Sequence, residues 1–270
     1  MDCSKEKNIA SRFEDWTINS EFDNRSYQIF VSKPNQAPPP SGYPVIYVLD
    51  GNAFFQTFQE AVRLQSRKTE KTGVIPAIVV GIGYPTDNDF DLTNRLYDFT
   101  PSAPNNFYNK SLGVEDFQKT GGADTFLKFI EEDLMPQINK KFKVNLQQQT
   151  IFGHSLGGLF TLYTLFTHPK AFQNYIASSP SIWWNDRYIL NKVPQFMKYF
   201  SGKKLEVSVF LAVGSLEKEF MINDTKELSN RLSTLENNKL KILFNEVKGE
   251  NHISVVPTIL SSALRFVSKY

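Results

Sequence analysis

A serine within a cluster of glycines is the strongest candidate for chemistry in this sequence. Residues 153–158 read GHSLGG, and the first five of them fit the pattern Gly-x-Ser-x-Gly. In that pattern a strand turns sharply into a helix, small neighbours relieve crowding, and the serine hydroxyl stands free at the turn. The helix N-terminus also favours negative charge that develops beside the serine. Because an apolar run precedes the motif and a helix-like run follows it, we expect Ser155 to be a nucleophile rather than a packing residue of a glycine turn.

A serine hydroxyl needs a general base, and the chain has three histidines to supply one. His154 lies inside the motif, where its position is expected to point it away from the nucleophile. His168 precedes a proline in a predicted helix-to-strand loop, where a surface role is favoured. His252 follows the last predicted strand, so its loop reaches the same edge of the sheet as Ser155. We therefore expect His252 to be the base, although a lone histidine is more often structural.

The acid that orients this histidine should follow the strand that ends at Val213, because α/β-hydrolases place serine, acid and histidine in that order. Three carboxylates come after that strand, namely Glu217, Glu219 and Asp224. Glu217 is nearest to the strand end and is the preferred acid. Glu219 stays open as an alternative, as does a serine–histidine pair that works without an acid.

The negative oxygen formed during acyl transfer needs two backbone N–H donors. One should be Leu156, which follows the nucleophile, and the other should come from the loop after the strand at residues 45–49. Asn52 in that loop is the expected second donor. The histidines show no H-E-x-x-H spacing, so the sequence predicts neither a metal nor an organic cofactor.

Strand and helix patterns alternate along the chain, which predicts an α/β fold. Strands are predicted at 26–31, 43–51, 75–82, 149–152, 174–178, 206–213 and 240–247, and helices at 53–65, 124–142, 159–166, 221–235 and 256–267. This alternation implies a mostly parallel sheet with helices on both faces. Residues 84–122 look like one long loop, which suggests a lid or a binding wall. We predict a flexible N-terminus over residues 1–15 and one domain over residues 16–270.

The bulk composition excludes several classes of function. The formal net charge is +2 and no dense basic run occurs, so nothing points to nucleic acid. No apolar run reaches the roughly 18 residues of a membrane span. Cys3 is the sole cysteine, which excludes an internal disulfide and fits a cytoplasmic protein. The alternative is that Cys3 is the acylated residue of a lipid-anchored or periplasmic lipoprotein; the oligomeric state stays open.

Several motifs together resemble one family. They are VLDGN (48–52), RLYDFTP (95–101), GHSLGG (153–158), SPSIWW (179–184) and the histidine loop at 249–252. The set is similar to the esterase D-like family of α/β-hydrolases, and within it to siderophore esterases that open enterobactin- or bacillibactin-type trilactones. The resemblance covers nearly the whole chain, from about residue 16 to residue 270. It implies an α/β-hydrolase fold and a serine esterase that acts on a small-molecule ester.

The resemblance also implies roles for matching positions. Ser155 and His252 carry over directly as nucleophile and base, and Glu217 matches the family acid, which some siderophore esterases lack. Arg95 would lie by the pocket and bind an acidic or catecholate oxygen.

Two of these implied roles have structural alternatives. Arg95 could instead form a buried ion pair with Asp98 or Asp116. Trp183 or Trp184 would wall the acyl or aryl pocket, and we expect the other of the two to belong to the core.

The substrate does not follow from the family alone, because related members include S-formylglutathione hydrolases, feruloyl esterases, carbohydrate esterases and mycolyltransferases. A feruloyl, acetyl-sugar or general short-acyl esterase is therefore the alternative within enzymes. A non-catalytic binding module on the same fold is the alternative from another class.

Overall fold

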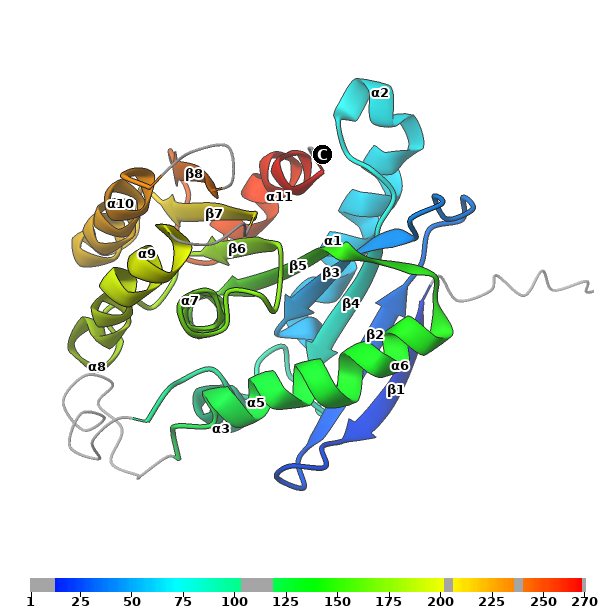
Figure 1. Ribbon diagram of the computed structural model, residues 1–270, viewed down its shortest axis with the longest axis horizontal. Coiled ribbons are helices and arrows are strands. Elements are labelled where there is room, and N and C mark those ends of the chain that lie inside the picture. Colours follow the sequence, from blue (N-terminus) through cyan, green and yellow to red (C-terminus); the bar gives the residue numbers. More distant parts are fainter. Residues whose placement is uncertain (1–12, 103–118, 202–205, 236–239, 269–270) are drawn as a thin grey trace, which may run out of the picture.

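The chain folds around one eight-stranded sheet, seen in the computed structural model, which describes residues 13–102, 119–201, 206–235 and 240–268 (Figure 1). The strand order is β1-β2-β4-β3-β5-β6-β7-β8. The strands are β1 (Glu14–Asn19), β2 (Ser26–Ser32), β3 (Tyr43–Leu49), β4 (Ile78–Gly83), β5 (Val144–His154), β6 (Asn174–Ser178), β7 (Val207–Gly214) and β8 (Leu240–Val247). β1 pairs with β2 and β2 with β4 in antiparallel fashion, and all other neighbours are parallel. The predicted mostly parallel sheet is therefore present.

Helices cover both faces of this sheet, as the alternating pattern predicted. They are α1 (Gly51–Gln65), η1 (Ser66–Lys68), α2 (Thr69–Thr72), α3 (Leu92–Asp98), α5 (Ala123–Lys128), η2 (Phe129–Leu134), α6 (Met135–Lys141), α7 (Leu156–Thr167), α8 (Trp184–Arg187), η3 (Tyr188–Lys192), α9 (Val193–Ser201), α10 (Glu219–Ser233) and α11 (Val255–Val267). α1 and α11 share one apolar cluster, while α5, α7, α9 and α10 contribute to the cluster on the opposite face (Figure 1). Because both faces are covered, every residue of β3, β4, β6 and β7 is buried.

Three parts of the fold differ from the sequence-based expectation. β1 starts at Glu14, so the predicted boundary between a flexible N-terminus and the domain falls inside a strand. The segment 84–122 contains α3, whose first turn is capped by Asp91 accepting a hydrogen bond from the Asn94 amide (2.9 Å). The segment is therefore not one loop, and its residues 103–118, on which the lid prediction depends, lie outside the described residues. The stretch 184–201, for which no element was predicted, forms α8, η3 and α9.

The parallel strands bring distant parts of the sequence to one edge of the sheet. Asp50 follows β3, Ser155 follows β5, Glu217 comes shortly after β7, and His252 comes shortly after β8. The carboxyl ends of parallel strands lie at the same edge, which is where α/β proteins place their ligands. The fold therefore gathers the candidate residues before any side-chain geometry is considered.

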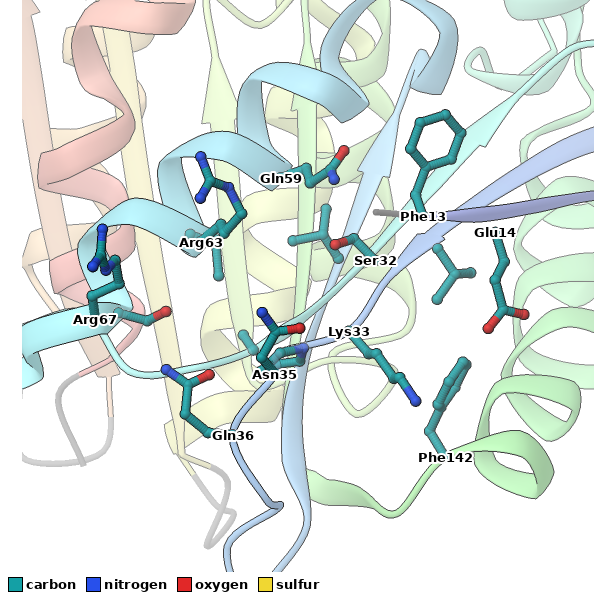
Figure 2. Close-up of a pocket in the computed structure, with 16 residues that line it drawn as sticks. Phe13, Glu14, Ser32, Lys33, Asn35, Gln36, Gln59, Arg63, Arg67 and Phe142 are labelled. Carbon is teal, nitrogen blue, oxygen red and sulfur yellow. The ribbon is translucent and has the colours of Figure 1, made fainter. Parts of the chain in front are cut away.

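A cavity of about 740 Å³ lies at the opposite edge, near the start of β4 and the end of β2 (Figure 2). Gln59 and Arg63 of α1 face it from one side, and Lys33 and Asn35 face it from the other. No histidine or cysteine is among its lining residues, so this cavity lacks an imidazole that could act as a general base.

Within the described ranges, no helix combines the length and the apolar character needed to cross a membrane. Cys3, on which the lipoprotein alternative depends, lies outside those ranges.

Candidate active site

Ser155 occupies a strained turn between β5 and α7. Its φ of 58° and ψ of −115° lie in a region that residues with a side chain rarely adopt, at a cost of roughly 1–3 kcal/mol. Two backbone hydrogen bonds hold the turn, from the Ser155 amide to Ser178 (3.0 Å) and from the Ser181 amide to the Ser155 carbonyl (3.0 Å). Such strain persists only where the surroundings impose it, which favours a functional reason for this serine.

Crowding around the turn explains two of the three glycines of the motif, Gly153 and Gly158. It does not explain Gly157. A Cβ on Gly153 would lie 2.0 Å from the carbonyl oxygen of Gly157, so no side chain fits there. A Cβ on Gly157 would meet its nearest neighbour, Asp50 Oδ2, at 3.5 Å, which is ordinary contact. The second crowded glycine is Gly158, where a Cβ would approach the Cα of Pro180 to 2.9 Å. The pattern was thus right about Gly153 and wrong about the steric need for Gly157.

Replacing Gly153 with alanine is expected to lower the free energy of unfolding by about 3 kcal/mol or more, because backbone atoms must move. The matched change Gly157→Ala should shift it by less than about 1 kcal/mol, since the space is free and alanine favours a helix. Urea unfolding of the two variants compares these values directly. Equal losses in both variants would contradict this explanation of the motif.

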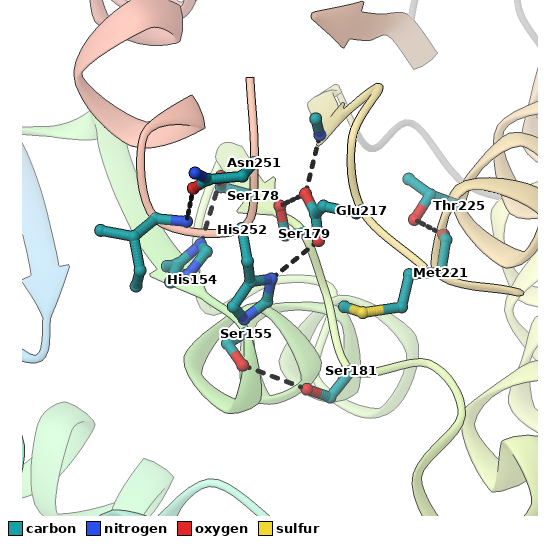
Figure 3. A network of polar contacts seen from close by, with 12 residues as sticks. His154, Ser155, Ser178, Ser179, Ser181, Glu217, Met221, Thr225, Asn251 and His252 are labelled. Atoms are coloured by element: carbon teal, nitrogen blue, oxygen red, sulfur yellow. Dashed lines mark hydrogen bonds and ion pairs between the residues drawn. The ribbon is translucent and has the colours of Figure 1, made fainter. Parts of the chain in front are cut away.

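His252 and Glu217 are joined by a hydrogen bond at the edge of the sheet (Figure 3). The Nδ1 atom of His252 lies 2.7 Å from Oε2 of Glu217. The side chain of Glu217 is 1% exposed, whereas that of His252 is 38% exposed. The imidazole lies between Glu217 and Ser155 in Figure 3, so the acid and the serine are on different sides of the ring.

The carboxylate of Glu217 is held by two further donors. Its Oε1 accepts hydrogen bonds from the hydroxyl of Ser179 (2.6 Å) and the amide of Gly214 (2.7 Å). Burial raises the pKa of Glu217, but the hydrogen bonds from His252, Ser179 and Gly214 outweigh burial and leave the pKa below its usual value. Glu217 is therefore a fixed anion beside the imidazole. Ser179, which sequence reasoning did not single out as a site residue, has a φ of 45°.

The hydroxyl of Ser155 opens into a cavity of about 480 Å³ that His252 also lines. Its Oγ lies 3.4 Å from Oγ of Ser181, a buried residue that also lines the cavity (Figure 3). The structure thus brings together Ser155, His252 and Glu217, the three side chains that the sequence grouped. Ser181 is a neighbour of the nucleophile that sequence reasoning missed, although it belongs to the SPSIWW motif.

His154 packs behind the base, a contact that was not expected. Its ring centre is 4.6 Å from that of His252, and its Nδ1 lies 3.4 Å from the hydroxyl of Ser178. Burial lowers the pKa of His154 well below its usual value, and the nearby His252 and Arg95 add to this effect. A neutral imidazole can support the ring of His252 without opposing the positive charge that a general base acquires.

Asn52 and Leu156, the expected amide donors, lie in the first turns of α1 and α7. The first amides of a helix have no acceptor within it, so they are available to a ligand. The two helix starts adjoin, as the short distance from Gly157 to Asp50 indicates. The side chain of Asn52 bonds to both the amide (2.8 Å) and the carbonyl (3.0 Å) of Tyr84, which fixes its turn.

Arg95 is engaged by a carboxylate rather than free to bind substrate. Its Nε and Nη2 atoms donate to the two oxygens of Asp50, each at 2.9 Å, and it is 7% exposed. The buried ion pair considered from the sequence is present, but its partner is Asp50 and not Asp98; Asp116 lies outside the described residues. Asp50 precedes Asn52, so the pair fixes the turn that carries this candidate donor.

Asp98 forms a separate buried site on α3. It is fully buried, its Oδ2 accepts a hydrogen bond from the Tyr84 hydroxyl (3.0 Å), and its Oδ1 lies 3.7 Å from Arg25. Burial raises the pKa of Asp98 to about 7, despite the opposing effects of Arg25 and Tyr84. From about pH 4 to pH 7 the folded chain thus holds a proton that the unfolded chain has lost, so rising pH costs stability.

Replacing Asp98 with asparagine removes this titration while keeping an acceptor for Tyr84. Relative to the unchanged protein, the free energy of unfolding of Asp98→Asn should therefore rise by about 2–3 kcal/mol from pH 5 to pH 8. Denaturant unfolding at both pH values measures the difference. A difference that does not change with pH would show that Asp98 is charged throughout.

The adjacent residues Trp183 and Trp184 divide between the core and the cavity. Trp184 is fully buried, whereas Trp183 is partly exposed and lines the cavity beside Ser155. The cavity is lined by Ser155, Ser181, Trp183, Leu216, Glu217, Lys218, Phe220, Met221, Asn251, His252 and Ile253. Most of this surface is apolar, so the site suits an aromatic or aliphatic group attached to the reacting carbonyl.

The other candidate residues lie apart from the cavity lining. Glu219 is the exposed first residue of α10, and Asp224 pairs with Arg187 at 2.7 Å. His168 ends α7 and lies 3.0 Å from the hydroxyl of Thr167. Among the described residues, no group of three histidine, cysteine or acidic side chains is arranged to hold a metal.

Comparison with known proteins also points to an esterase. The family described as "Putative esterase" matches residues 20–255. The "Ferri-bacillibactin esterase BesA" of Bacillus subtilis is 48% identical, over 92% of this chain and 87% of its own length. The "Siderophore enterobactin esterase" of Emericella nidulans is 34% identical, over 94% of this chain and 92% of its own.

A solved structure confirms the predicted α/β-hydrolase fold. The crystal structure of the BES protein from Bacillus cereus superposes with a TM-score of 0.93, is 52% identical, and covers 99% of this chain and 100% of its own.

Proposed function

The chain belongs to this esterase family and is an ester hydrolase; on that premise we propose that it opens siderophore trilactones by serine catalysis at Ser155. The observation that carries the proposal is the arrangement of Glu217, His252 and a strained Ser155 beside one apolar cavity. The carboxylate fixes the ring, the ring faces the hydroxyl, and the strained turn exposes that hydroxyl. These are the parts that acyl transfer through a covalent intermediate requires.

In the proposed reaction, Ser155 Oγ attacks the ester carbonyl carbon while His252 takes its proton. The carboxylate of Glu217 stabilises the imidazolium, which then protonates the leaving alcohol. The amides of Asn52 and Leu156 donate to the oxygen that becomes negative. Water activated by His252 finally releases the acyl group and restores Ser155.

The siderophore substrate is inferred from the relatives and from the cavity. Relatives that match nearly the whole chain are named for bacillibactin and enterobactin. The cavity is wide and apolar, with Trp183 on its wall, which suits the aromatic arms of a catecholate trilactone. The relatives are named as esterases, which favours a hydrolase over the alternative of a binding module.

A substrate panel tests this proposal. We expect kcat/KM for a catecholate trilactone to exceed that for p-nitrophenyl acetate, feruloyl esters and acetylated sugars, with Ser155→Ala as the inactive control. Preference for a feruloyl or acetyl-sugar ester would reject the siderophore substrate but leave the serine mechanism standing.

A further inference from the structure

We propose that Lys218 selects esters whose aromatic arm carries a negative charge. The inference deepens the proposed function, on which it rests, because it concerns the cavity where Ser155 would react. Lys218 directly follows the candidate acid Glu217 and lines the same cavity. Its exposed side chain places Nζ 5.9 Å from the ring centre of Phe220, another lining residue.

The charge of Lys218 is not neutralised within the site. No other described residue forms an ion pair with Lys218 in the structure. Its neighbour Glu217 turns its carboxylate inward to His252, Ser179 and Gly214. An ammonium group beside the cavity is therefore available to an anion on a bound ligand.

The position of Lys218 in the fold opposes helix stability. It occupies the N-cap of the 15-residue helix α10 and makes no side-chain capping bond. Helix starts favour serine, threonine, aspartate or asparagine at this position, and the helix dipole disfavours a cation there. Lys218 therefore goes against the N-cap preference at the edge of the candidate site, which suggests that it is there for a functional reason.

The surface around Lys218 is apolar and unusually open. Leu216 is 67% exposed, Phe220 38% and Ile253 53%, and all three line the cavity together with Trp183. Large apolar side chains that gather at an open site mark a surface that a ligand covers. An apolar cavity with the ammonium group of Lys218 beside it fits an aromatic ring that bears an anionic group. The ferric complex of a catecholate trilactone has this chemistry, because its deprotonated catechols outweigh the charge of the iron.

The test compares two pairs of esters, and the members of each pair differ by one anionic sulfonate group. The pairs are 2-naphthyl acetate with its 6-sulfonate, and 4-nitrophenyl benzoate with its 4-sulfonate. Lys218→Met, which keeps most of the length of the side chain, should lower the anionic-to-neutral ratio of kcat/KM by about three- to fivefold in at least one pair, the upper part of the range of an exposed ion pair. Lys218→Arg, which keeps the positive charge, should keep the ratio.

A third variant separates selectivity from structure. Lys218→Ser supplies a capping hydroxyl, so it should raise the melting temperature by about 1–3 °C while losing the anionic preference. A ratio that stays unchanged in both pairs, or an equal loss on neutral and anionic esters together with a lower melting temperature, would overturn the inference.

Assays of the same variants with iron-free and ferric trilactone separate the proposed siderophore substrate from the proposed role of Lys218. Lys218→Met should weaken hydrolysis of the ferric form more than that of the iron-free form. If the unchanged protein opens neither form, the siderophore substrate is rejected, while the naphthyl and benzoate pairs still decide the role of Lys218.

Discussion

Replacing Ser155 with alanine should lower kcat for any ester by on the order of 10⁶-fold, the loss seen when a triad nucleophile is removed. The reason is that the hydroxyl supplies the covalent step, and Ser181, whose Oγ is 3.4 Å away, does not occupy the strained turn. Steady-state hydrolysis of p-nitrophenyl acetate and of a trilactone measures the loss. A variant that keeps more than about one hundredth of the activity would contradict the role of Ser155.

Replacing Ser155 with glycine separates the effect of backbone strain on stability from the effect of the hydroxyl on catalysis. Ser155→Gly removes the hydroxyl as well, but glycine adopts a φ of 58° without penalty. We therefore expect this variant to be as inactive as Ser155→Ala and more stable than the unchanged protein by about 1–3 kcal/mol. Equal stability of the glycine and alanine variants would show that the turn is not strained.

Replacing His252 with alanine is the second change expected to have a very large effect, on the order of 10⁶-fold in kcat. Without the imidazole, neither the attack of Ser155 nor the departure of the alcohol has a proton carrier. Because the side chain of His252 is 38% exposed, the fold should tolerate its loss. Kinetics and the melting temperature of the same preparation measure the two effects. An active His252→Ala enzyme would contradict the proposed base.

The matched change Glu217→Gln tests whether the acid is needed. The amide cannot accept the Nδ1 proton and bind Ser179 and Gly214 equally well, so the ring would lose its preferred tautomer. We expect kcat to fall by about 10⁴-fold, less than in His252→Ala. Unchanged kcat would favour the serine–histidine pair that the sequence left open.

Much of the candidate site could be predicted because the positions of strands along the chain and the chemistry of the turns that follow them are local signals. The motif around Ser155 predicted the strained turn, and the loops after the last two strands predicted where Glu217 and His252 meet. The apolar runs likewise predicted a mostly parallel sheet, because a strand buried on both faces has few polar residues.

The remaining features depend on contacts that no local pattern records. Arg95 and Asp50 are 45 positions apart and meet only because the fold brings α3 to the turn between β3 and α1. The stretch 184–201 includes three successive residues with positive φ, Asn185, Asp186 and Arg187, which no helix propensity predicts. The packing of His154 against His252 also requires the folded sheet, since one ring belongs to the last residue of β5 and the other to the loop after β8.

The central claim is that Ser155 forms the covalent bond to substrate. Its most direct test is to treat the protein with a serine-directed fluorophosphonate and locate the adduct by peptide mass spectrometry. We expect a single adduct on the peptide that carries Ser155, with labelling abolished in Ser155→Ala and strongly slowed in His252→Ala. An adduct on Ser181 or elsewhere, or no labelling of a protein that still hydrolyses esters, would contradict the claim.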